Sequence, residues 1–123
     1  MSLSDYAENA LADHLMGTSS LTMPTVIHAK LHLGDPGEAG TSSPAVETTR
    51  SADIGFGAAS GGVATASATV SWTSVSTAET YSHISLWDHP TAGNCLGSGA
   101  LAASKAVNIG DDFDLTALTF TLT

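Results

Sequence analysis

The stretch LWDHPTAGN, residues 86–94, places a tryptophan, an aspartate and a histidine side by side. A carboxylate that orients an imidazole is a common arrangement around a catalytic base. Neighbouring residues on a strand point to opposite faces, however, so adjacency alone does not make Asp88 and His89 such a pair. The sequence also lacks a G-x-S-x-G elbow, an HExxH motif and a Walker-type glycine loop. We can therefore name no catalytic residue, and the sequence predicts a protein that is not an enzyme.

Two histidines in TVIHAKLHL, residues 25–33, raise the possibility of a metal site. On a strand that rises roughly 3.3 Å per residue, His28 and His32 share a face but lie about 13 Å apart. One zinc ion cannot bridge that distance, since its ligand bonds are about 2 Å long. We expect both rings to face solvent or a subunit contact, and a shared ion would need a symmetry axis between copies. No metal and no cofactor is predicted.

The remaining reactive side chains stand apart from one another. The three aspartates of GDDFD, residues 110–114, lack the further ligands of a calcium loop and indicate a solvated turn. Glu47 and Glu79 are isolated in polar stretches, whereas a glycosidase needs two carboxylates that face one cleft. Cys95 is the sole cysteine, which excludes an intrachain disulfide, and its apolar surroundings favour burial.

Aromatic residues offer a binding surface instead of a reaction centre. Tyr81 and Trp87 fall on the polar face of an alternating strand, and Asp88 follows them. Exposed rings beside a carboxylate can stack on a sugar and accept hydrogen bonds from it. Trp72 shares its parity with apolar neighbours and is expected in the core. Tyr81, Trp87 and Asp88 are thus the candidate residues of a carbohydrate-binding site.

The first element that could position such residues is a helix over residues 1–17. Its apolar stripe consists of Leu3, Ala7, Leu11 and Leu15, and Gly17 is the expected terminator. Ser2 or Ser4 can supply the N-cap oxygen. The stripe fits two arrangements equally well: a docking helix that binds a neighbouring subunit, or a helix packed on its own domain.

Residues 18–123 show the period of strands and predict one β-sandwich domain. About seven short runs follow one another without an intervening helix, which favours an antiparallel sandwich preceded by the single helix. Residues near 37–49 are polar and without period, and we expect a flexible loop there. The predicted strands are residues 25–33, 50–56, 63–72, 81–88, 95–101, 105–109, 113–115 and 118–123.

Charge narrows the range of partners. Three cationic residues stand against twelve acidic ones, which gives a net charge of −9. Such a chain repels phosphate groups, so nucleic acids and anionic membranes are not expected as partners. The N-terminal sequence MSLSDYAENAL is acidic where a secretion signal is basic, and we expect synthesis in the cytoplasm without export by that route.

The chain contains five segments in order: SDYAENALADHLMG, VIHAKLHLGDPGEAGT, FGAASGGVATASATVSW, SHISLWDHPTAGNCLGSGALAASKAVNIGDDF and LTFTL. Taken together, these motifs resemble a family of small virion proteins of tailed bacteriophages, often labelled tail fibre or minor tail proteins. They mark turns and strand ends and span nearly the whole chain. The resemblance supplies no catalytic residue to carry over.

The resemblance implies a non-enzymatic structural component of the virion. Its partners would be other capsid or tail proteins and further copies of itself, as a homotrimer or another symmetric oligomer. Two placements remain open: a tail or fibre module, and a head decoration or cement protein. Binding of host surface glycans is the alternative function.

Overall fold

The computed structural model describes residues 1–122 and is mainly β, with antiparallel sheets and one helix near the N-terminus, as predicted. Its elements are β1 (Ser2–Leu3), α1 (Asp5–Leu15), β2 (His28–His32), β3 (Val63–Thr65), β4 (Val70–Trp72), β5 (Glu79–Trp87), β6 (Cys95–Val107), β7 (Phe113–Leu115) and β8 (Thr119–Thr121). A four-stranded sheet has the order β1-β6-β5-β2, and two separate pairs are β3-β8 and β4-β7.

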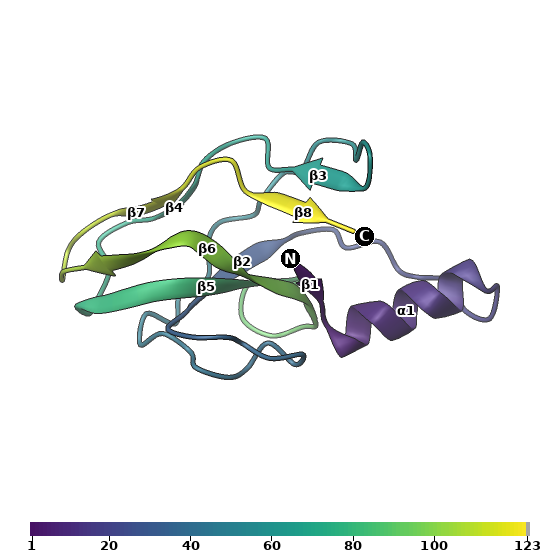
Figure 1. Ribbon diagram of the computed structural model, residues 1–123, viewed down its shortest axis with the longest axis horizontal. Coiled ribbons are helices and arrows are strands. Elements are labelled where there is room, and N and C mark those ends of the chain that lie inside the picture. The colour runs from purple at the N-terminus through teal and green to yellow at the C-terminus, as the bar shows by residue number, and fades with distance from the viewer. Residues whose placement is uncertain (123) are drawn as a thin grey trace.

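The two strand pairs lie over one face of the four-stranded sheet (Figure 1). Apolar side chains of both layers form one core between them, and Leu31 of β2, Ile84 of β5 and Phe113 of β7 belong to it. Burial of such apolar surface is the main favourable term in folding. The layered arrangement therefore follows from strands that each carry one apolar face.

Strand register sorts β2 and β5 into two faces. Ala29 lies opposite Leu86 and Leu31 lies opposite Ile84, and all four side chains are in the core. The alternate positions, Lys30 opposite Ser85 among them, point to the other face of the sheet. The alternation predicts that this second face meets solvent or a subunit contact.

The second face is instead covered by residues 33–54, which we call the covering segment. It is the blue to teal coil on the side of the sheet away from the two strand pairs (Figure 1). Backbone hydrogen bonds fix it along β2: Leu33 N to Ser43 O, Ala45 N to Leu31 O, Ser51 N to Ala29 O and Ile54 N to Ile27 O. These bonds satisfy the otherwise free edge of β2. The flexibility expected near residues 37–49, within this segment, stays a prediction.

Burial under the covering segment corrects the expectation for the two histidines. His28 is 8% exposed and His32 is 0% exposed, so neither ring faces solvent. The alternation was correct, but it could not show that a loop covers the polar face.

Several strand boundaries differ from the predicted ones. Residues 50–56 form no strand. Most of this stretch, residues 50–54, belongs to the covering segment. The predicted run 63–72 is divided into β3 and β4, and the two runs predicted within 95–109 are one long strand, β6. The last strand was expected to reach residue 123, which lies outside the described residues.

The helix begins at Asp5, after a short strand, rather than at residue 1. Ser4 is the N-cap, and its Oγ accepts a hydrogen bond from Ala7 N at 3.1 Å. The same hydroxyl donates to Cys95 O, and Ser4 N donates to Leu96 O. The cap therefore ties the helix to β6. Within the described residues no helix is long and apolar enough to cross a membrane.

Gly97 of β6 lies directly beneath β1. A Cβ atom at this position would be 2.6 Å from Ser2 O and 3.0 Å from the ring of Phe120. Gly99, two residues further along, would place its Cβ no closer than 3.4 Å to Met1. The close approach of β1 to β6 thus requires glycine at 97 and not at 99.

Gly97→Ala should displace β1 and lower the free energy of unfolding by about 1–3 kcal/mol. Gly99→Ala, the matched control, should change it by less than about 0.5 kcal/mol. Urea denaturation of both variants measures the difference. Equal stability of the two variants would contradict the packing of β1 described above.

Candidate functional site

Tyr81, one of the predicted sugar-stacking rings, is 0% exposed, so the expectation that it is exposed was wrong. A bulge in the pairing of β5 with β6 lies between Tyr81 and His83 and changes the alternation, which turns Tyr81 to the core. There its ring meets Phe113 edge-on at 5.1 Å between centroids. Burial, together with the negative charges of Glu79 and Glu47, raises the pKa of the Tyr81 hydroxyl to about 12.

Trp87 is also buried, with 8% exposure, although it does point away from the core face as predicted. The covering segment closes over it: a Cβ at Gly40 would be 3.2 Å from the indole. The Arg50 guanidinium lies 4.2 Å from the ring centroid, within cation–π range. Arg50 also donates to His89 O at 2.6 Å and Ala92 O at 2.7 Å. Trp87 is therefore covered by the chain itself.

A chain of hydrogen bonds runs from Trp87 into the covering segment. Trp87 Nε1 donates to Ser85 Oγ at 2.7 Å, and Ser85 Oγ lies 2.8 Å from His32 Nε2. His32 Nδ1 lies 2.9 Å from Ser42 O, a carbonyl that can only accept. Nδ1 must then carry the proton, which leaves Nε2 to accept from the Ser85 hydroxyl. All donors and acceptors in this series of hydrogen bonds are paired only while His32 is neutral.

Burial and the nearby charges agree with this assignment. Burial lowers the pKa of His32, and the positive charges of Lys30 and His83 lower it further, against the raising effect of the Ser42 carbonyl. His28 makes the corresponding contact at the other end of β2, with Nδ1 2.7 Å from Ser51 O. Both imidazole rings thus hydrogen-bond to backbone carbonyl groups of the covering segment and fix it in place. Residues 1–122 contain no group of three or more His, Cys, Asp or Glu side chains placed to hold a metal ion.

Asp88 and His89 shape the turn that follows β5. Asp88 Oδ1 accepts from Asn94 N at 2.6 Å, a bond typical of a carboxylate in a turn. His89 is exposed, and its Nδ1 accepts from Ala92 N at 2.9 Å. Each side chain is bonded to the backbone of its own turn, and they do not form a base and its orienting partner.

Glu47 and Glu79 act as acceptors for backbone N–H groups. Glu79 accepts from Val46 N and Glu47 N, at 2.7 and 3.0 Å. Glu47 accepts from Ser76 N at 2.8 Å and Thr49 N at 3.3 Å. Burial alone raises the pKa of Glu47, but these hydrogen bonds outweigh it and lower the pKa below its ordinary value. Both carboxylates fix the covering segment to the start of β5.

The other singled-out residues have structural roles as well. Trp72 is 4% exposed and in the core, as predicted, and donates from Nε1 to Thr49 O. Cys95 is buried, also as predicted, and burial raises the pKa of its thiol. In the turn before β7, Asp111 accepts from Asn108 N and Asp112 accepts from Ser74 N.

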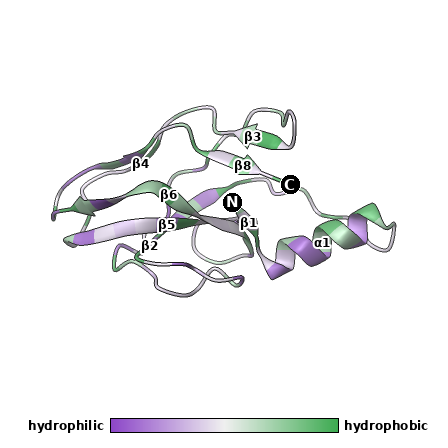
Figure 2. Cartoon of the chain, viewed as in Figure 1, coloured by the Kyte–Doolittle hydropathy of each residue, from purple (hydrophilic) through white to green (hydrophobic). Residues whose placement is uncertain are grey.

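The predicted docking stripe is divided between two elements. Leu3 lies on β1, not on the helix, while Ala7 and Leu11 lie on α1 and are half-buried. Leu15 is 66% exposed at the far end of α1. Apolar colour at the end of α1 that lies away from the sheets is visible in Figure 2.

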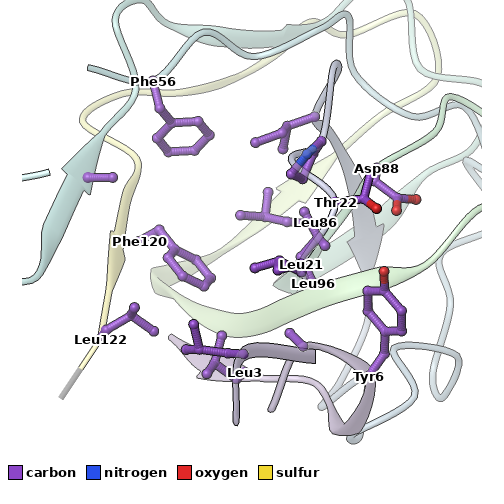
Figure 3. Close-up of a pocket in the computed structure, with 15 residues that line it drawn as sticks. Leu3, Tyr6, Leu21, Thr22, Phe56, Leu86, Asp88, Leu96, Phe120 and Leu122 are labelled. Carbon is purple, nitrogen blue, oxygen red and sulfur yellow. The ribbon is translucent and has the colours of Figure 1, made fainter. Parts of the chain in front are cut away.

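An apolar groove lies between α1 and the β3-β8 pair, and sequence reasoning missed it. It has a volume of about 290 Å³. Its walls include Leu3, Leu11, Leu21, Leu96, Phe120 and Leu122. The rings of Phe56 and Phe120 stand on one side in Figure 3, and Tyr6 and Asp88 stand on the other.

The groove could not be read from one stretch of sequence because its walls come from segments far apart in the chain. One signal was present: Leu21 and Met23 are large apolar residues in the connector between helix and sheet, where no periodicity requires them. Three of the four predicted docking residues, Leu3, Ala7 and Leu11, contribute to its wall. Tyr81 and Trp87 do not.

Comparison with known families gives a match over almost the whole chain. The family described as Podophage GP4 fiber I protein gp80 matches residues 2–123. The resemblance to virion proteins of tailed phages is thereby confirmed. No curated protein matches the chain.

Stability should depend on pH through His32. Its folded pKa lies below the ordinary value of 6.5, so the unfolded chain takes up the proton first as the pH falls. The free energy of unfolding should be constant above about pH 7 and should decrease below about pH 6.5, by at most about 1.4 kcal/mol per pH unit. Urea denaturation between pH 5 and 7.5 measures this slope.

Two variants separate His32 from the other histidines. His32→Asn should lower stability at pH 7.5 by about 1–3 kcal/mol and flatten the slope between pH 5 and 6.5. His14→Asn, at an exposed position on α1, should retain the slope of the unmodified protein. A slope that is unchanged in His32→Asn would refute the buried neutral imidazole as its source.

Proposed function

Because this chain belongs to the phage fibre family described as Podophage GP4 fiber I protein gp80, we propose that it is a non-enzymatic structural module of the virion, placed in the tail or its fibres. The match over residues 2–123 carries this proposal. It is made in the host cytoplasm and functions in the assembled particle.

The bonding of three candidate reactive side chains supports a structural role. His32, Glu47 and Asp88 are each hydrogen-bonded to backbone or buried hydroxyl groups. A catalytic group must instead reach a substrate within hydrogen-bond distance. These three residues therefore stabilise the fold, and the groove beside α1 is the surface that we propose for function.

Head decoration is the competing placement. A small compact β-domain can cover a capsid in many symmetry-related copies, whereas a tail holds only a few. The family description names a fibre protein, which favours the tail. In either place we propose a symmetric oligomer, such as a homotrimer, that contacts other virion proteins.

Binding of host glycans through Tyr81, Trp87 and Asp88 is the second proposal, and it has less support. Stacking on a sugar needs an open aromatic face. Trp87 would present one only after Arg50 and the covering segment had moved away, and Tyr81 lies in the core. The groove does not replace this site, because almost all of its lining is apolar while sugars need hydrogen-bonding groups.

Quantitative mass spectrometry of purified particles tests the proposed function. We expect the protein in the virion at a few copies per particle relative to the major capsid protein. Hundreds of copies would assign it to the head and contradict the tail placement. Absence from purified particles would contradict the structural role altogether.

A further inference from the structure

The groove beside α1 is lined almost entirely by apolar side chains. Two of its wall residues, Leu21 and Leu122, are 37% and 43% exposed. Leu15, Met16 and Met23, which lie close to wall residues in the sequence, are 66%, 76% and 79% exposed. Exposed apolar surface of this kind marks a site of protein contact.

One acidic residue lines this groove, and others lie next to its wall residues. Asp88 is part of the wall, and Asp53 accepts a hydrogen bond from the backbone of Ile27, another wall residue. On α1, Asp5 and Glu8 flank the wall residues Tyr6 and Ala7.

Asp88 interacts electrostatically with the Arg50 guanidinium, but no cationic side chain lines the groove itself. None of the three cationic residues of the chain, Lys30, Arg50 and Lys105, lines the groove. The guanidinium of Arg50 is held over Trp87 and bonded to the turn after β5. The groove therefore has an apolar floor and a negative border.

We propose that this groove binds a segment of a different virion protein, one that inserts apolar side chains and carries Lys or Arg residues beside them. The inference rests on the proposed function, since it assumes that the chain is built into a particle. Apolar contact supplies the affinity, and the acidic border selects a basic partner.

Charge complementarity excludes the other occupants. A second copy of the chain would bring a further net charge of −9 and the same acidic helix to the acidic border. Like charges that meet at an interface are unfavourable. Anionic lipid and nucleic acid are repelled for the same reason. A protein segment with apolar side chains and neighbouring Lys or Arg residues complements both the apolar floor and the acidic border of the groove.

Site-specific photo-cross-linking in assembled particles identifies the occupant. The photoreactive residue benzoylphenylalanine replaces Leu21 in one chain and Ile109 in a control chain. Ile109 is 73% exposed and lies in the turn before β7, outside the groove wall. We expect position 21, and not position 109, to cross-link to another virion protein at an apolar stretch with Lys or Arg within a few residues.

Three results would overturn the proposal. They are a cross-link from position 21 to a second copy of this chain, a cross-link to a segment without basic residues, and no cross-link although the protein is present in particles. Absence of the protein from particles is a different result and would refute the proposed function itself. The copy number, measured on the same sample, separates the two failures.

Matched substitutions test separately the roles of the apolar floor and of the acidic border of the groove. Leu21→Asp should lower the copy number per particle by at least about tenfold, whereas Ile109→Asp should leave it unchanged. Glu8→Lys should lower it by about two- to fivefold, and Asp114→Lys, an exposed charge reversal on β7, should not. Equal effects within either pair would overturn the corresponding half of the proposal. Circular dichroism verifies that each variant is folded.

Discussion

The structure depends on the burial of both faces of the four-stranded sheet. One face packs on the β3-β8 and β4-β7 pairs through apolar side chains, but the other carries histidines, a serine and a tryptophan. A polar group that leaves water must find a partner inside the protein, or its burial costs about 1–3 kcal/mol. The hydrogen bonds that link Trp87, Ser85, His32 and Ser42 provide these partners. All of them point from Trp87 toward Ser42, and each donor is matched to an acceptor. The covering segment can stay in place because these bonds are complete.

The closed face engages side chains that could otherwise take part in chemistry. Arg50 hydrogen-bonds to the turn after β5, while Glu47 and Glu79 accept hydrogen bonds from backbone N–H groups. The groove beside α1 is an apolar surface that residues 1–122 leave open. For a member of a phage fibre family, we propose that this groove attaches the protein to a neighbouring protein. The proposed function thus lies on a side of the molecule that the covering segment does not cover.

The sequence predicted what depends on local pattern. The mainly β fold, the N-terminal helix, the core position of Trp72 and the burial of Cys95 all follow from periodicity or local composition. It failed where a distant segment decides the environment. An alternating strand shows which residues share a face, but not whether a loop covers that face, and so His32 and Trp87 were expected at the surface. The bulge that turns Tyr81 inward left no local signal, and the groove formed by several segments left only the apolar residues of the connector, Leu21 and Met23.

The central claim is that the partner binds the groove beside α1, while the face over Trp87 is closed by the chain itself. Hydrogen exchange followed by mass spectrometry, on the free protein and on assembled particles, tests it most directly. In the free protein, amides of the covering segment that bond to β2, such as Ala45 and Ser51, should already be protected. Assembly should then add protection to peptides that cover residues 6–24 and 120–122. New protection confined to residues 33–54 and 86–94 would contradict the account.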